Sequence, residues 1–367
     1  MSKARGLADL GNVYDDGALS NRNMVVNGAC NVAQRGAGPF TNASGGYQTV
    51  DRFQLSGTMG GSFTLEQASD APSGSGFSKS FKALAPTGFS SPTSTASAKI
   101  MTSLEGQNLQ QLLKGSSNAL PVTLSFWVKS VVTGTYVFEL YDEDNNRTIS
   151  TAYSVSTSNT WEKKTITISG DTSGALGNDN GKSLSLVWWL GAGSNFTSGT
   201  LNTSWNATVT ANRAAGQVNA VASNNDAFYL TGVQLEVGDT ATPFEHPRSY
   251  GDELVRCQRY FYSATNGSTG YLATFWQYSS SGNLNAVVEF PVTMRAEPTL
   301  AHNATNAGYF IGYGSGLGQN WTTLTLNEQT QKNATVYNNQ YSNYGSGSAG
   351  GFYVGSSAAY LHFDAEL

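Results

Sequence analysis

Charged residues are scarce in this sequence of 367 residues. Lys, Arg, Asp and Glu together make up 12% of it, about half the share that is usual for soluble domains. The 20 basic residues form no cluster, which argues against a nucleic-acid partner. Apolar runs such as residues 184–190 fall far short of the ~20 residues that a membrane-spanning helix needs. No apolar segment follows Met1, so we expect neither a secretory signal nor membrane insertion.

Cysteine and histidine are also scarce, with two and three residues. Cys30 and Cys257 can build neither a disulfide framework nor a four-ligand zinc site. Two buried free thiols are favoured over a single disulfide. His246, His302 and His362 do not stand at metal-ligand spacing from one another. We therefore expect no metal and no other cofactor.

Glycine and aromatic residues are abundant, with 41 Gly, 17 Phe, 18 Tyr and 7 Trp. So many aromatic side chains are incompatible with a solvated coil. Short segments with strand character are bounded by Gly, Asn, Asp or Ser, and the clearest are residues 124–129, 135–140, 164–168 and 184–190. In the first of these, Leu124, Phe126 and Val128 alternate with polar or amphipathic residues. This period is typical of a half-buried strand in an antiparallel sandwich. The pattern predicts a mainly all-β chain.

The pattern divides the chain into four segments. Residues 1–20 have few strand formers and are interpreted as a tether, and residues 21–248 form the sandwich. Pro243 and Pro247 mark a connector, because proline interrupts regular structure. A short linking helix is expected over 249–262, and a smaller C-terminal β domain over 263–367. A second helix is expected over 104–113, and further strands over 286–290, 322–326 and 359–363.

Two groups of acidic residues are candidates for chemistry. Residues 142–146 begin like a calcium loop, but Arg147 replaces the required glycine and Tyr153 replaces the bidentate glutamate. The alternative is a polar hairpin tip, which the flanking strands favour. Glu105, Asp226 and Glu245 are the isolated carboxylates that a glycosidase would have to pair. With no nucleophile motif in the sequence, they are interpreted as caps and surface groups, and no enzyme activity is expected.

Several blocks of the sequence are similar to tail-fibre and receptor-binding structural proteins of marine, cyanophage-like bacteriophages. The blocks are residues 17–28, 33–36, 47–53, 105–106, 124–130, 134–136, 161–163, 232–238, 241–246, 248–254, 257–260, 290–299 and 364–367. The resemblance implies a jelly-roll β-sandwich like a carbohydrate-binding module, followed by a variable tip domain. Most of the interior of 263–367 lies outside the matched blocks.

Aromatic residues carry the binding hypothesis, because sugar rings stack on Trp and Tyr while their hydroxyls pair with polar side chains. In the sandwich, Trp127, Trp188, Trp189 and Trp205 are interpreted mainly as core. In the tip, Tyr and Trp lie among Gly, Ser and Asn, a mixture typical of adaptable binding surfaces. A subunit interface is the alternative for these residues. The predicted glycan-binding residues are Trp276, Tyr309, Tyr313, Trp321, Tyr341 and Tyr344.

We therefore expect a virion structural protein: a phage tail-fibre subunit that attaches to the virion by its N-terminus. Its tip would recognise a host-surface polysaccharide or lipopolysaccharide. A homo-oligomer, most simply a trimer, would cover the uncharged segment 298–327. The alternatives are a capsid fibre or decoration protein without a receptor role, and a surface-polysaccharide depolymerase.

Overall fold

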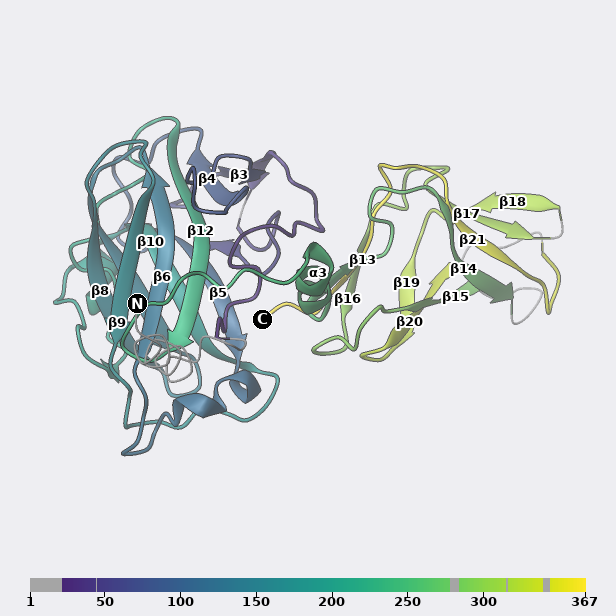
Figure 1. Cartoon of the computed structure of the whole chain (residues 1–367). Helices are drawn as coiled ribbons and strands as arrows, with labels where there is room; N and C mark the ends of the chain where they lie inside the picture. The colour runs from purple at the N-terminus through teal and green to yellow at the C-terminus, as the bar shows by residue number, and fades with distance from the viewer. Residues whose placement is uncertain (1–21, 44, 278–283, 315, 339–343) are drawn as a thin grey trace, which may run out of the picture. The chain divides into compact units, whose positions relative to one another are not determined.

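The structure, a computed structural model, describes residues 22–43, 45–277, 284–314, 316–338 and 344–367. The chain forms two compact units, Met1–Tyr250 together with Leu367, and Gly251–Glu366 (Figure 1). Strands dominate both units, which confirms the mainly all-β fold class. Among the described residues, no helix has the length and apolar character needed to cross a membrane.

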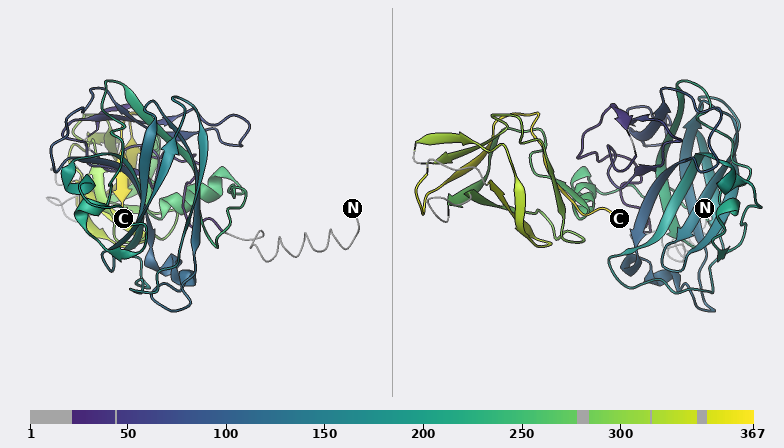
Figure 2. Two further views of the ribbon diagram at one scale, coloured as in Figure 1. Left: turned by 90° about the vertical axis from the view of Figure 1, so that its left-hand side faces the viewer. Right: turned by 180° about the vertical axis from the view of Figure 1, so that it is seen from behind.

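The first unit is a sandwich of two six-stranded antiparallel sheets, visible as two layers in Figure 2. In spatial order, one sheet contains β1 (Phe40–Ala43), β3 (Phe63–Ala68), β4 (Ser80–Ala85), β12 (Asp226–Val237), β6 (Val122–Ser130) and β9 (Glu162–Ile168). The other contains β11 (Asn206–Ala207), β8 (Arg147–Val155), β7 (Gly134–Asp142), β10 (Lys182–Ala192), β5 (Ser97–Glu105) and β2 (Gln54–Ser56). The chain changes sheet repeatedly between β4 and β12, so this unit is a jelly-roll sandwich, as expected.

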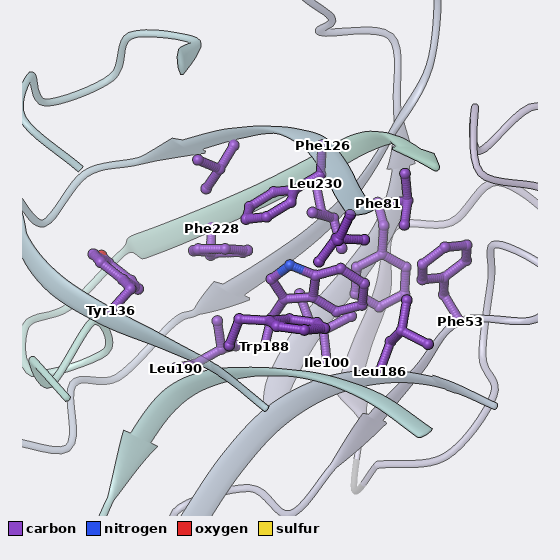
Figure 3. Close-up of a cluster of buried hydrophobic side chains, with 14 of the residues drawn as sticks. Phe53, Phe81, Ile100, Phe126, Tyr136, Leu186, Trp188, Leu190, Phe228 and Leu230 are labelled. Carbon is purple, nitrogen blue, oxygen red and sulfur yellow. The ribbon is translucent and has the colours of Figure 1, made fainter. Parts of the chain in front are cut away.

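The sandwich core is apolar and rich in aromatic side chains. Leu124, Phe126 and Val128 of β6 are buried in the core, as the alternation predicts. Ser125 and Lys129 on the other face are buried as well, so the expectation of a half-buried strand is wrong. Trp188 of β10 packs edge-on against Phe126, with 5.7 Å between ring centroids (Figure 3). Burying a large apolar side chain stabilises a fold by about 1.5–3 kcal/mol. This interior accounts for the stability of the unit without disulfides.

The helices are short, and two expected helices differ from the structure. Within the described residues, the helical elements are η1 (Gly106–Asn108), η2 (Gln110–Leu112), α2 (Ser194–Thr197), η3 (Thr210–Asn212) and α3 (Tyr250–Gln258). The helix expected over 104–113 is wrong, because Leu104 belongs to β5 and pairs with Leu184. Two 3-10 turns then carry Leu109 and Leu112 into the core. The linking helix expected over 249–262 ends at Gln258, and β13 begins at Phe261.

The second unit contains a three-stranded and a seven-stranded antiparallel sheet. The smaller sheet contains, in spatial order, β13 (Phe261–Ser263), β22 (Leu361–Asp364) and β16 (Thr299–His302). The larger contains β18 (Leu317–Asn320), β17 (Phe310–Gly314), β21 (Ala349–Val354), β14 (Gly270–Gln277), β15 (Leu284–Glu289), β20 (Asn333–Asn338) and β19 (Thr325–Gln329).

The seven-stranded sheet is strongly curled. Its two edge strands, β18 and β19, are consecutive in the sequence and are joined by residues 321–324 alone. A flat sheet would separate them by six strand spacings, about 29 Å. Five steps of extended chain reach only about 18 Å. The sheet therefore curls around this connection, which carries Trp321 and Leu324 into the core. For this reason the strand expected over 322–326 begins only at Thr325.

Both cysteines are buried and neither is in a disulfide, which confirms the favoured interpretation. Cys30 lies in the sandwich core, where burial raises the pKa of its thiol to about 12. A thiol in this environment is unreactive, because the thiolate is the nucleophile.

Candidate functional site

The outer face of the sandwich sheet that contains β10 is covered by the chain's own residues. Trp189 of β10 is buried in a small apolar cluster against Phe196 and Ala214 from the segment after β10. From the same segment, Arg213 donates two hydrogen bonds to the carboxylate of Glu139, at 2.7 and 3.0 Å. The indole N–H of Trp189 donates to the same carboxylate at 3.1 Å. This part of the face is therefore occupied by a built-in polar network.

Of the four sandwich tryptophans that the sequence assigned mainly to the core, two are core residues. Trp188 and Trp189 are fully buried, whereas Trp127 and Trp205 are half-buried. The indole N–H of Trp205 donates to the carbonyl of Ser169 at 2.8 Å, and the Lys114 ammonium lies 5.1 Å from its ring centroid.

The candidate catalytic carboxylates all accept hydrogen bonds from their surroundings. Glu105 accepts from the side chain of Gln107, and Asp226 accepts from the backbone N–H of Ser223 at 2.7 Å. Glu245 accepts from two backbone N–H groups, those of Arg22 and Asn23, at 2.6 and 2.9 Å. Glu105 and Asp226 are buried, so for these two the expectation of surface groups is wrong; Glu245 is half-buried.

Asp142, the first residue of the calcium-like motif, ends β7 and pairs with Arg147 at the start of β8, so the motif is a hairpin tip, as the flanking strands indicated. Its carboxylate pairs with the Lys114 ammonium, which also contacts Asp171 at 3.1 Å and the carbonyl of Gly174 at 2.8 Å. Within the part of the chain that the structure describes, no three His, Cys, Asp or Glu residues group in a way that would hold a metal ion.

The clearest aromatic surface is on the outer face of the seven-stranded sheet. Tyr271 of β14, Tyr313 of β17 and Tyr353 of β21 form a triangle of mutually edge-on rings, here called the tyrosine cluster. The centroids are 5.1 Å apart for Tyr271 and Tyr353, 5.5 Å for Tyr313 and Tyr353, and 6.4 Å for Tyr271 and Tyr313. Tyr271 is 70% exposed and Tyr313 is 40% exposed. Such rings offer apolar area and hydroxyl groups together, the combination that sugar binding needs.

Two glycines make room for the rings of this cluster. A Cβ added at Gly351 would lie 2.3 Å from a ring carbon of Tyr271, and one added at Gly318 would lie 2.7 Å from a ring carbon of Tyr313. Each ring therefore packs directly against the backbone of the neighbouring strand, at a position that has no side chain. Contacts of this kind hold an exposed side chain in place at low entropic cost on binding.

The opposite, inner face of the sheet is core. Trp321 stacks on Phe352 with 4.5 Å between ring centroids, and Phe275 lies edge-on to Trp321 at 5.8 Å. Tyr344 is buried beside Phe275, and its hydroxyl donates to the carbonyl of Gly312 at 2.7 Å. Burial raises the pKa of the Tyr344 hydroxyl.

The structure does not bring the six predicted glycan-binding residues together. Tyr313 and Trp276 are on the outer face of the sheet and are exposed, and Tyr309, which directly precedes β17, is half-buried. Trp321 and Tyr344 are corrections: both are buried in the core, so their rings do not reach solvent. Tyr341 lies outside the described residues. Whether the exposed residues bind a glycan stays a prediction.

The predicted set omitted two members of the tyrosine cluster, Tyr271 and Tyr353. The sequence contains a usable signal in the pair Gly350 and Gly351 beside Tyr353, because neighbouring glycines in a strand indicate close approach of other groups. That signal does not say which tyrosine approaches, since the pairing of β14 with β21 joins residues about 80 positions apart.

Comparison with known proteins found similar solved structures but no matching sequence family or curated protein. Among the solved structures that it resembles is the enzymatically active domain of tailspike protein 4 of bacteriophage CBA120, at 15% identity and a TM-score of 0.31, covering 59% of this chain and 21% of that one. Another is TmCBM61 in complex with β-1,4-galactotriose, at 10% identity and a TM-score of 0.31, covering 59% and 99%.

A third is the family 11 carbohydrate-binding module of a cellulosomal cellulase of Clostridium thermocellum. It is 13% identical with a TM-score of 0.28, and the match covers 57% of this chain and 97% of the module. The chain thus spans the length of such modules but only about a fifth of the tailspike domain. At these identities the likeness concerns the fold and not the activity of any neighbour.

Proposed function

We propose that this chain is a subunit of a phage tail fibre that recognises a host-surface glycan through its second unit. The observation that carries the proposal is the tyrosine cluster: three rings in mutual contact, two of them exposed, on an uncharged part of a sheet. In the first unit, the large aromatic side chains of the described residues are buried or half-buried, apart from Tyr250. Exposed aromatic residues thus gather mainly in the second unit.

The chemistry of the cluster favours a neutral ligand. The C-terminal segment 263–367 contains only two basic residues, Arg295 and Lys332. Arg295 donates to the carbonyls of Ala365 and Glu366, at 2.8 and 3.0 Å, and so holds the end of the chain. Anionic groups such as phosphate or sulfate are bound by clusters of Arg or Lys. Recognition at the tyrosine cluster therefore relies on ring stacking and neutral hydrogen bonds.

The virion role rests on the sequence resemblance to tail-fibre proteins. In this proposal, residues 1–20 attach the chain to the virion, and three copies form one fibre. A trimer would present three clusters to one cell surface, and multivalency would strengthen weak single sites. The protein would act in the virion after assembly in the host cytoplasm.

Adsorption of fibre-bearing particles to host cells tests the proposal. Tyr271→Ala removes the most exposed ring of the cluster, and Tyr360→Ala is a matched control, because Tyr360 is 38% exposed and its ring stacks on His362 of the other sheet. We expect Tyr271→Ala to lower adsorption about tenfold, typical of an important interface residue, and Tyr360→Ala to leave it unchanged. Equal adsorption by both variants would contradict the glycan-binding role. Intact, adsorbing particles that lack the protein would contradict the fibre role.

A further inference from the structure

A break in the register of β14 places a second aromatic residue on the same face as the tyrosine cluster. Tyr271 and Trp276 are five positions apart, and in a regular strand they would face opposite sides of the sheet. Opposite β21, however, Tyr271 pairs with Tyr353 while Ala273 pairs with Phe352, so that Leu272 is an extra residue. This is a β-bulge. Because of it, Tyr271 and Trp276 are both outward and exposed, at 70% and 39%.

Trp276 has polar and aromatic neighbours across the sheet. The cross-strand row runs from Trp276 to Asn285 of β15, then to Tyr337 of β20 and Thr325 of β19. Residues aligned in this way share one face of a sheet. The row therefore combines two aromatic rings with an amide and a hydroxyl, and it contains no charged side chain. Charged residues of this sheet, Glu289 and Glu328, are at other positions of β15 and β19.

The two aromatic positions are far enough apart to contact different sugars of one chain. Leaving out the bulged residue, four strand steps separate Tyr271 from Trp276, about 13 Å. Thr274, which is exposed, lies between them on the same face. This separation exceeds the length of a disaccharide unit, so no single sugar reaches both positions.

We propose that the outer face of this sheet binds a neutral, linear oligosaccharide of at least three sugars, with the tyrosine cluster and Trp276 as separate subsites. This inference rests on the proposed function and defines its ligand class. Monosaccharides and disaccharides occupy one subsite, the tyrosine cluster, whose three rings offer the larger contact. Longer chains bridge both, and the second contact adds to the first without a second loss of translational freedom.

The test is a chain-length series. The probes are neutral gluco-, galacto-, manno- and xylo-oligosaccharides of one to six sugars, titrated against the full chain by calorimetry. For the series that binds, we expect affinity to rise about tenfold or more between two and four sugars. Trp276→Ala should remove this rise and leave the affinity for one or two sugars unchanged. Trp276→Phe, which keeps a ring, should retain part of the rise.

The outcomes separate the inference from the proposed function. If the chain binds glycans but affinity does not depend on chain length, or if Trp276→Ala weakens short and long ligands equally, the two-subsite model is wrong and glycan recognition stands. If no series binds, the proposed function itself is contradicted for neutral glycans. If Trp276→Ala dissociates an oligomer instead, this face is a subunit interface and the inference is overturned. Thermal unfolding of each variant excludes loss of the fold as the cause.

Discussion

Replacing Gly350 and Gly351 one at a time by alanine should separate core packing from ligand binding. The two glycines are adjacent in β21, but their missing side chains face opposite sides of the sheet. A Cβ at Gly350 would lie 2.1 Å from the backbone carbonyl oxygen of Tyr313 and 2.7 Å from a ring carbon of Phe275. A Cβ at Gly351 would instead meet a ring carbon of Tyr271 at 2.3 Å. Neither glycine adopts a positive φ, so alanine is compatible with both backbones.

The expected costs differ because the obstructing atoms differ. At Gly350 the obstruction is backbone and a fully buried ring, neither of which can move freely. Overpacking of this kind costs about 1–3 kcal/mol, which corresponds to a decrease in Tm of roughly 5–15 °C for a unit of this size. At Gly351 the Tyr271 ring can rotate into solvent. If the ring is instead held about 30° off its rotamer, this costs about 0.5–1.5 kcal/mol, and the smaller entropy of the unfolded chain offsets about 0.4–1 kcal/mol of that.

Scanning calorimetry of the full chain measures both variants, since it resolves units that unfold separately. We expect Gly350→Ala to lower the transition of the second unit, and Gly351→Ala to shift it by no more than a few degrees. In glycan binding the order should be reversed, because Gly351→Ala removes the Tyr271 ring from the tyrosine cluster. If Gly351→Ala destabilises as much as Gly350→Ala, or if it leaves glycan affinity unchanged, the assignment of the two faces is refuted.

Three further predictions concern buried groups. Trp321→Ala should destabilise the second unit by about 3–5 kcal/mol, as measured by calorimetry, because its ring is fully buried; an unchanged transition with lost glycan binding would contradict its place in the core. Arg213→Met should cost about 3–5 kcal/mol in denaturant unfolding, because it leaves the fully buried Glu139 carboxylate without its charge partner. Burial and the nearby Arg213 lower the pKa of Lys99 from 10.5 to about 8, so the unfolded chain holds this proton more tightly than the folded chain. Lys99→Met should therefore be more stable than the natural chain below pH 8, and this difference should shrink as the pH rises to about 10.5; a difference that grows over this range would contradict the burial of the ammonium group.

Local patterns in the sequence determined the fold class and many of the strands. The alternation in residues 124–129 identified β6 and its buried side correctly, because side-chain direction in a strand has a period of two. The polar segment between two such strands was correctly interpreted as a hairpin tip, which follows Asp142 at the end of β7. These features depend on neighbouring residues alone, so the sequence contains all the information needed to predict them.

Helical spacing was less reliable. Leu104, Leu109 and Leu112 were interpreted as one side of a helix, yet Leu104 is in a strand, Leu109 lies between two 3-10 turns and Leu112 ends the second of them. Apolar residues with this spacing can be buried by more than one backbone conformation, and tertiary packing determines which conformation is adopted. The α-helical propensity of a short segment is too small to override that packing.

The sequence by itself determined that the C-terminal residues are aromatic, polar and nearly free of charge, and this composition directed attention to a neutral ligand. The tertiary structure alone decided which rings reach solvent. Trp276 and Trp321 have similar sequence neighbours, among them Ser, Gly, Asn and Thr. Trp276, however, points outward from β14, whereas Trp321 belongs to the connection between β18 and β19 and is buried in the core of the unit. Strand pairing and a single bulge set these directions. Both depend on contacts between residues distant in the sequence, where a shift of one position reverses the face of every side chain.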